Sequence, residues 1–282
     1  MSPTVLLLVV ASAAIHVGWN ALARSARRSA SFAWLVNVSG AALLLPLLIA
    51  RRFAQPFALD GTLLGLAAIS ALFEAGYFVL LEAAYAKGEL SVVYPLSRGI
   101  APLLALLPAR AVSGDGVDAR ALAGIVVVVA GCVWNAGSAE RRSVLLALLV
   151  GAATAAYQLV DRRAMQLAPR GAELDFLATM QIFLAALMTL WWWFGRRRTF
   201  RIERRDLRTA LFAALGIQLA YFLILLALRD GSASIVAAAR NVGIPLSLLA
   251  ASLLLKERIA PRRVVGALLI VAGIILPLEF SG

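Results

Sequence analysis

The chain has 282 residues, of which 62% are hydrophobic, and its mean hydropathy is +0.89. Soluble domains contain about 45–50% apolar residues, so this composition excludes a soluble protein and predicts an integral membrane protein. The formal net charge is +12, but nearly all the arginines lie in short tracts between apolar segments. Such tracts are typical of orientation signals in a membrane protein and not of a nucleic-acid-binding face.

Cys132 and His16 are the single cysteine and the single histidine of the chain. An intramolecular disulfide and the zinc motifs that need paired histidines are therefore excluded. The sequence also has no phosphate-binding loop that ends in Gly-Lys-Ser or Gly-Lys-Thr, so the chain carries no nucleotide-driven motor of its own. We expect no metal, no cofactor, no catalytic residue and no nucleic-acid partner.

Ten apolar segments have about the length of 20 residues with which a helix crosses a bilayer. They span residues 3–22, 31–49, 61–84, 90–110, 119–137, 143–164, 173–194, 207–228, 232–255 and 261–278. The predicted fold is therefore an all-α, polytopic membrane protein in a lipid bilayer. A cleaved signal peptide is the alternative for the first segment, although this segment lacks a basic start and carries His16, Trp19 and Asn20.

Several residue pairs recur along the chain at separations of 142 to 144 residues. They are Tyr77-Phe78 with Tyr221-Phe222, Pro102-Leu103 with Pro245-Leu246, and Gly124 and Gly131 with Gly266 and Gly273. The chain thus divides into two related halves of five segments, residues 1–138 and 139–282. Because five is odd, the halves must insert in opposite directions, which predicts an inverted repeat with a binding site between them. We expect the four glycines to be close-packing positions.

The distribution of Lys and Arg predicts an orientation. The loops after the odd-numbered segments carry 17 of these residues and the opposite side carries 8; the other two, Arg98 and Arg240, lie within segments. The positive-inside rule then places the first set of loops in the cytoplasm and both termini outside. The excess of Arg over Lys and the abundant Ala suggest a GC-rich bacterial genome, so we expect the bacterial inner membrane.

Charged residues occur near the middle of three predicted helices, namely Glu74, Arg98 and Arg240. A charge at the bilayer centre costs roughly 2.5–3.5 kcal/mol, so it is kept where it is paired or lines a polar path. Pro95 and Pro102 also predict an interrupted fourth helix. The sequence therefore predicts a polar pocket near the midplane, with Glu74 as a proton acceptor or cation contact. The alternative is a fixed Glu74–Arg98 ion pair that only holds helices together.

Further polar residues are expected at this pocket because they share helix faces with the charges or occupy equivalent positions of the repeat. They are Trp19, Asn20, Tyr77, Tyr94, Ser97, Tyr157, Gln158, Gln218, Tyr221 and Asn241. With two arginines against one acid, the pocket is predicted to be positive and to favour an anionic or zwitterionic solute. His16 shares a face with Trp19 and titrates near neutral pH, so it is a candidate proton carrier; helix-packing hydrogen bonds are the alternative.

The segment from His16 to Asn20, the positions of Pro102 and Pro245, and the sequence from Leu253 to Leu276 resemble the EamA-type drug/metabolite transporter family. The first half departs from the family pattern where Ser113-Gly114 replaces a glutamate. Members of this family are often drawn with both termini in the cytoplasm, which conflicts with the charge count. In the related four-helix multidrug transporters, a membrane glutamate precedes a lysine by eight residues. His16 precedes Arg24 by the same distance, which suggests His16 for the coupling position.

The resemblance implies a secondary active transporter of a small polar or amphipathic metabolite that works by alternating access and is driven by protons or by exchange. We expect an exporter, a monomer or homodimer, and no enzymatic activity, although no residue pattern distinguishes import from export. Two alternatives stay open. One is an intramembrane enzyme acting on a lipid-linked substrate, and the other is a non-transporting scaffold or sensor.

Overall fold

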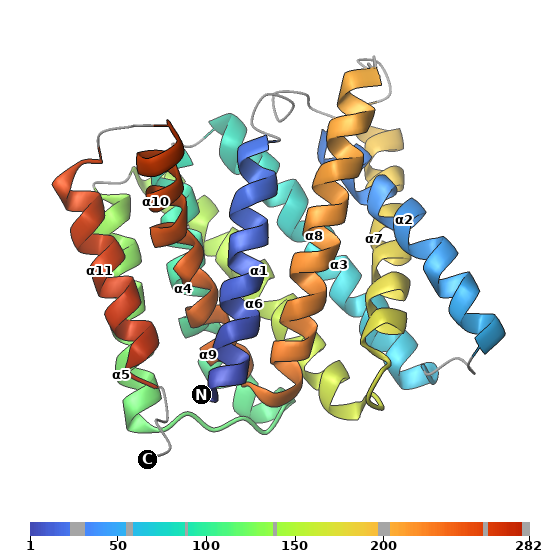
Figure 1. Cartoon of the computed structure of the whole chain (residues 1–282), viewed down its shortest axis with the longest axis horizontal. Coiled ribbons are helices and arrows are strands. Elements are labelled where there is room, and N and C mark those ends of the chain that lie inside the picture. The colour runs from blue at the N-terminus through green and yellow to red at the C-terminus, as the bar shows by residue number, and fades with distance from the viewer. Residues whose placement is uncertain are drawn as a thin grey trace.

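The computed structural model of the chain describes residues 1–22, 32–54, 59–87, 90–137, 140–196, 204–255 and 259–277, and the regular structure in these ranges is helical (Figure 1). The elements are α1 (Pro3–Leu22), α2 (Phe32–Ala54), α3 (Gly61–Lys87), α4 (Leu90–Val112), α5 (Ala119–Ala136), α6 (Arg141–Leu167), α7 (Glu173–Arg196), α8 (Arg204–Asp230), α9 (Ala233–Ala239), η2 (Arg240–Val242), α10 (Gly243–Leu255) and α11 (Pro261–Ile275). Each predicted segment coincides with one helix, except that α9, η2 and α10 together form the ninth.

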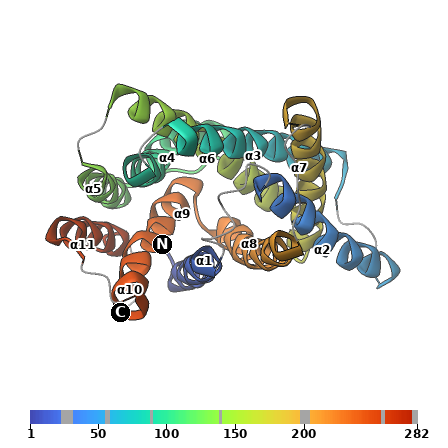
Figure 2. The same cartoon turned by 90° about the horizontal axis from the view of Figure 1, so that it is seen from above.

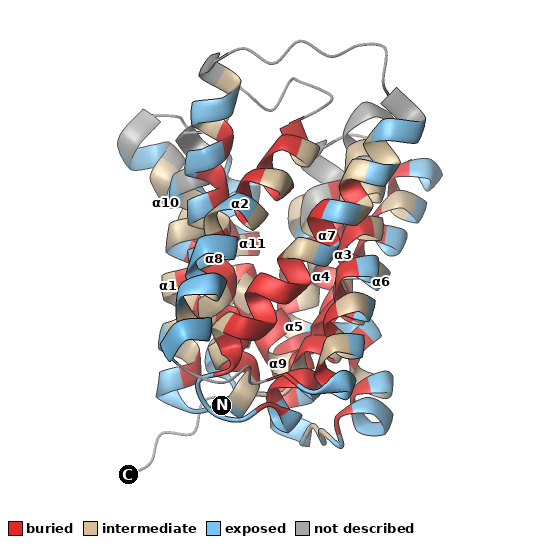
Figure 3. Cartoon of the chain, turned by 90° about the vertical axis from the view of Figure 1, so that its right-hand side faces the viewer, coloured by how far each residue is buried: buried red, intermediate tan, exposed pale blue. Residues whose placement is uncertain are grey.

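Seven helices of the described residues are long and apolar enough to cross a membrane. They are Phe32–Ala54, Gly61–Ala83, Ala119–Ala136, Arg141–Leu167, Glu173–Phe194, Asp206–Asp230 and Ala233–Ala250, and Pro3–Gly18 and Pro95–Leu106 are apolar but shorter. Large apolar side chains also cover the outside of the molecule, since Leu7 is 69%, Phe53 89% and Leu253 74% exposed. Buried residues lie toward the interior (Figure 3). The predicted polytopic helical membrane protein is confirmed, while ten membrane crossings remain a prediction.

The helices form two facing rows, which Figure 2 shows from above. One row contains α5, α4, α6, α3 and α7 in this order, and the other contains α11, α10, α1, α8 and α2, with each helix packed on its neighbour. Contacts of α5 with α11 and of α2 with α7 close the two ends. Each row therefore contains helices from both halves of the sequence, so the space between the rows is lined by both.

The α5–α11 seam is built on glycine. A Cβ added at Gly124 would lie 2.6 Å from the carbonyl oxygen of Gly273, and one added at Gly131 would lie 2.7 Å from that of Gly266. The four glycines are therefore close-packing positions, as predicted. Because Gly124 meets Gly273 while Gly131 meets Gly266, the two helices run antiparallel. Gly124 is equivalent to Gly266 and Gly131 to Gly273, so each contact has a counterpart between the equivalent residues, as across a two-fold axis.

Two further contacts join residues that lie about one repeat length apart in the sequence. Gln181 Nε2 donates a hydrogen bond to the Asn37 carbonyl at 2.8 Å, and these residues are 144 positions apart. Asn241 Nδ2 donates to the Arg98 carbonyl at 3.4 Å across 143 positions. A residue meets its own counterpart only near a two-fold axis. The insertion of the two halves in opposite directions stays a prediction.

The fourth and ninth segments differ from the prediction. The expected interruption of the fourth helix is wrong, because α4 runs unbroken through Pro95, Pro102 and Pro108, packed along α5 and α6. The ninth segment is the one that breaks, at η2. There the Asn241 side chain donates to the carbonyls of Ala237 and Ala238, both at 3.2 Å, which satisfies acceptors at the end of α9. A short 3-10 stretch inside a helical segment often marks a hinge.

Candidate functional site

An acid that the sequence analysis did not select lies at the centre of the buried polar residues. Asp161 on α6 is fully buried. Ser70 of α3 donates a hydrogen bond to Asp161 Oδ1 at 2.6 Å, and the hydroxyl group of Tyr221 on α8 donates to Oδ2. Asp161 thus joins three helices. Asp161 could have been found from the sequence, because it follows the selected residue Gln158 by three positions and therefore lies on the same helix face.

Glu74 and Arg240 belong to the same cluster. The charges of Asp161 and Arg240 both act on Glu74, and the charge of Arg240 also acts on Asp161. Arg240 Cζ lies 5.8 Å from the centre of the Tyr221 ring, a favourable cation–π distance. Glu74 is 9% exposed, and its Oε2 atom is buried without a hydrogen-bond partner, as is Arg240 Nη1. The site therefore presents one acceptor and one donor that the protein leaves unsatisfied.

Three predicted tyrosines line this cluster. The rings of Tyr77 and Tyr157 meet edge to face with their centres 6.0 Å apart, and Tyr157 lies 6.2 Å from Tyr221. Gln158, next along α6, is 2% exposed, and its Oε1 atom has no hydrogen-bond partner. We use the name polar cluster for these seven residues: Ser70, Glu74, Tyr77, Tyr157, Asp161, Tyr221 and Arg240. It combines ionisable groups with aromatic surface.

Asp161 changes the charge expected at this site. The prediction of a positive pocket counted Glu74 as the single acid against Arg98 and Arg240. In the structure, Asp161 is a second acid at this site, where Arg240 lies over the ring of Tyr221 and the Tyr221 hydroxyl group donates to Asp161, whereas the charge of Arg98 acts on Cys132 of α5. The count of two arginines against one acid, from which a positive pocket was predicted, therefore no longer holds.

Other predicted residues lie elsewhere or bind within the protein. Gln218 donates to Gln181 Oε1 at 2.9 Å, in an amide chain that continues to Asn37. Asn241 Oδ1 accepts from Cys132 Sγ at 3.6 Å beside the η2 break. Ser97 is buried on α4, and His16 is half-buried on α1, which packs mainly against α8. The side chains of Trp19, Asn20 and Tyr94 lie outside the described residues.

Three ion pairs with buried acids connect helix ends at the face of the molecule that carries the termini. Arg162 Nη2 lies 2.9 Å from Asp115, Arg229 Nε lies 2.6 Å from Glu173, and Arg51 Nε lies 2.9 Å from Asp175. The side chains of the three acids are only 5–7% exposed. Arg162 also donates to the carbonyls of Leu228 and Arg229, both at 2.7 Å. These pairs, named the ionic closure below, tie the ends of α2, α6 and α8 to the start of α7 and the α4–α5 loop.

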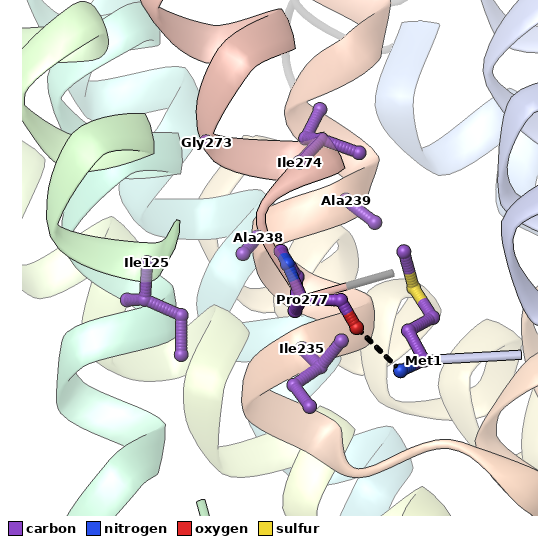
Figure 4. Close-up of a pocket in the computed structure, with 8 residues that line it drawn as sticks. All are labelled: Met1, Ile125, Ile235, Ala238, Ala239, Gly273, Ile274 and Pro277. Carbon is purple, nitrogen blue, oxygen red and sulfur yellow. Dashed lines mark hydrogen bonds between the residues drawn. The ribbon is translucent and has the colours of Figure 1, made fainter. Parts of the chain in front are cut away.

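A small cavity lies at the same face and is not the predicted pocket. Its volume is about 10 Å³, and its lining includes Met1, Ile125, Ile274 and Pro277 (Figure 4). The amino group of Met1 donates to the Pro277 carbonyl at 2.7 Å, so the two ends of the described chain meet here. A cavity of this size holds about one water molecule. Within the described ranges, no three acidic, histidine or cysteine side chains are grouped so that they could hold a metal ion.

The fold and the polar cluster define a class, that of multi-pass helical membrane proteins with ionisable groups buried between two rows of helices. Residues 141–278 match the model of the EamA-like transporter family. This match, over just under half of the chain, supports the assignment of the chain to the EamA-type drug/metabolite transporters that its sequence resembles.

Comparisons with other proteins add the fold of the whole chain. A crystal structure described only as "Crystal structure of protein" is similar to it with a TM-score of 0.77 and 17% sequence identity. The alignment covers 98% of this chain and 96% of the other, so the likeness extends over the first half, which lies before the family match. At this identity the comparison shows the fold alone. No curated protein matches the chain.

Proposed function

We propose that the chain is a secondary active transporter of a small polar or amphipathic metabolite and works by alternating access between two inverted halves, residues 1–138 and 139–282. The polar cluster carries this proposal, because ionisable side chains from both halves meet there. Glu74 Oε2 and Arg240 Nη1 are buried without hydrogen-bond partners. A buried polar atom left unpaired costs about 1–3 kcal/mol, and more when it is charged. A solute that satisfies both atoms is therefore bound favourably.

The chemistry of the cluster defines the solute. Glu74 offers an acceptor to an ammonium or hydroxyl group, and Arg240 offers a donor to a carboxylate or carbonyl group. The rings of Tyr77, Tyr157 and Tyr221 add an aromatic surface for an apolar part. A solute that carries both polar groups and an apolar body matches this arrangement best.

The ionic closure suggests which face is shut. Three buried ion pairs bind the helix ends on the face with the termini, so we propose that the described conformer is closed there. Opening requires these pairs to separate, and the η2 break beside the polar cluster offers a hinge. The proposed location is the bacterial inner membrane, with ten crossings and outward transport.

Transport would be driven by protons or by exchange of solutes. Glu74 and His16 are the candidate coupling residues, and proteoliposomes with an imposed pH gradient test them. Proton coupling predicts that Glu74→Gln or His16→Ala abolishes the dependence of uptake on the gradient. Coupling that is unchanged in both variants would leave exchange as the driving reaction.

A thermal-shift screen of the purified full-length protein against metabolites tests the proposed function. A solute at 100 times its Kd stabilises the protein by about 2.7 kcal/mol, so the true solute class gives a clear rise in Tm. The rise should vanish in Glu74→Ala and persist in Glu140→Gln, which changes an exposed acid at the start of α6. The stabilising solute should then be transported in proteoliposomes. Binding that survives loss of Glu74, or binding without transport, contradicts the proposal.

A further inference from the structure

We propose that Glu74 and Asp161 form one proton-binding site, in which the two carboxyl groups together hold a single proton beside Arg240. This inference rests on the proposed function, because it assigns the coupling proton to the same polar cluster. It adds Asp161, which the sequence analysis did not select, and it sets the number of bound protons at one.

The number of bound protons follows from the charges around Asp161. Ser70 donates to Asp161 and lies one helix turn before Glu74 on α3, so Glu74 is on the same face of α3. The Tyr221 hydroxyl group of α8 also donates to Asp161, and Arg240 of η2 lies over the Tyr221 ring. Tyr157 lies on the same helix, beside Tyr221. From α4, Arg98 acts on Cys132. With both acids ionised and Arg240 charged, the cluster has a net charge of −1.

Such a charge is unfavourable at this depth. Glu74 is 9% exposed and Asp161 is fully buried, so water compensates neither group. A charge inside a membrane segment costs roughly 2.5–3.5 kcal/mol, and two ionised carboxyl groups repel each other. One added proton makes the cluster neutral without moving any helix. A second proton would leave Arg240 as an uncompensated charge, so one proton is the favoured number.

The hydrogen bonds indicate which acid holds the proton. Both oxygens of Asp161 accept hydrogen bonds, from Ser70 and Tyr221, and such bonds stabilise a carboxylate. Glu74 Oε2 has no hydrogen-bond partner. The proton therefore resides on Glu74 in the described conformer, while Asp161 pairs electrostatically with Arg240. A cationic group of the solute that reaches Glu74 would take the place of the proton, which leaves for the aqueous face that is open.

Infrared spectroscopy of the full-length protein in proteoliposomes at neutral pH tests the site, because a protonated carboxyl group absorbs separately from a carboxylate. Labelling the carboxyl carbons of Glu or of Asp with carbon-13 separates the two residue types. The unaltered protein should show one protonated glutamate, and Glu74→Gln should remove its signal. Asp161→Asn should remove the same glutamate signal, because Glu74 then ionises opposite Arg240. Arg240→Gln should add a protonated aspartate.

Loss of a glutamate signal through a change at an aspartate is a result that a purely structural role for Asp161 does not produce. Glu140→Gln, at an exposed position on α6, is the matched control and should change nothing. The inference is overturned if the unaltered protein shows no protonated glutamate at neutral pH, or if the signal survives Glu74→Gln or Asp161→Asn. If the variants fail to fold, the spectrum of the labelled, unaltered protein still tests the inference, because it must show a protonated glutamate and no protonated buried aspartate.

The outcomes for the two proposals are separable. If the infrared signal is absent while a solute still stabilises the protein and is transported, the shared proton is wrong and the transporter stands. If the signal is present while no solute binds or moves, the proton site stands and the proposed function fails.

Discussion

The α5–α11 seam and the polar cluster are both contacts between the two halves of the chain, yet they are built in opposite ways. In the seam, equivalent positions carry the same residue, and Gly124 and Gly131 meet Gly273 and Gly266 backbone to backbone. In the polar cluster the equivalents differ. Glu74 corresponds to Gln218, and Arg240 corresponds to Ser97.

This difference separates scaffold from site. A contact between identical small residues gives close packing with no charge, which suits a part of the molecule that stays fixed. A cluster in which charged residues have uncharged equivalents in the other half is polar and costly to bury, so it is retained for what it binds. The ionic closure is likewise made of charged residues and lies on the face that has to open. Four predictions test this division between fixed and moving regions.

The largest effect is expected at the ionic closure. Arg162→Gln leaves the Asp115 side chain, 7% exposed, without its partner, and breaking a buried ion pair costs about 3–5 kcal/mol. The face with the termini should then open. Ala109, fully buried on α4 near this face, can report opening as Ala109→Cys in a Cys132→Ser background. Its labelling by a membrane-impermeant maleimide should accelerate by roughly 100-fold.

The control for this experiment is the neighbouring exposed arginine. Arg163→Gln removes the same charge from the same turn of α6 and should leave the labelling rate of the reporter unchanged. Equal rates in the two variants would mean that the ion pairs do not keep this face shut.

The second effect concerns the arginine of the polar cluster. Arg240→Gln removes the donor offered to the solute and leaves an acid without its countercharge. Truncating one partner of a buried charge pair costs about 2–5 kcal/mol, so solute affinity should fall by roughly 30-fold or more. Titration calorimetry measures this change, with Arg208→Gln, an exposed position on α8, as the comparison. An unchanged Kd would remove Arg240 from the site.

Substitutions in the α5–α11 seam should change the free energy of unfolding and leave the solute affinity unchanged. Gly131→Ala places a Cβ 2.7 Å from the Gly266 carbonyl oxygen, and such overpacking costs about 1–3 kcal/mol. Gly65→Ala on α3 meets no atom within 4 Å and should stabilise the helix by up to about 1 kcal/mol. Unfolding in mixed micelles should separate the two variants while Kd stays constant in both. A neutral Gly131→Ala would show that the seam is not close-packed.

The smallest effect is expected at the repeat equivalent of Glu74. Gln218→Ala loses the hydrogen bond to Gln181 Oε1, and such bonds between membrane helices are worth about 0.6 kcal/mol on average. Solute affinity should remain, whereas Glu74→Gln should reduce it strongly. Transport assays of the two variants side by side measure the contrast. Equal losses would mean that the two halves contribute alike to the site.

Much of the architecture followed from the sequence because it depends on local composition. Apolar runs of membrane length predicted the helices, and the recurrence of the glycines at one spacing predicted close packing at α5 and α11. Glu74, Arg240, Tyr77, Tyr157 and Tyr221 were selected because polar residues are conspicuous in such runs. Asp161 was not selected, because it lies near the end of its predicted segment, where an acid is ordinary, and its burial depends on how α6 packs against α3 and α8.

The sequence by itself determined that this chain is a helical membrane protein and predicted two related halves, because hydrophobicity and repeat spacing are properties of the chain read in order. Only the tertiary structure decided which charges meet. Arg98 and Arg240 occur near the middle of two predicted segments, yet Arg240 lies over the Tyr221 ring beside Asp161, in a segment that breaks at η2, while α4 continues through its prolines. Partners on different helices are set by the rotation and crossing of those helices, and these depend on packing across the whole assembly.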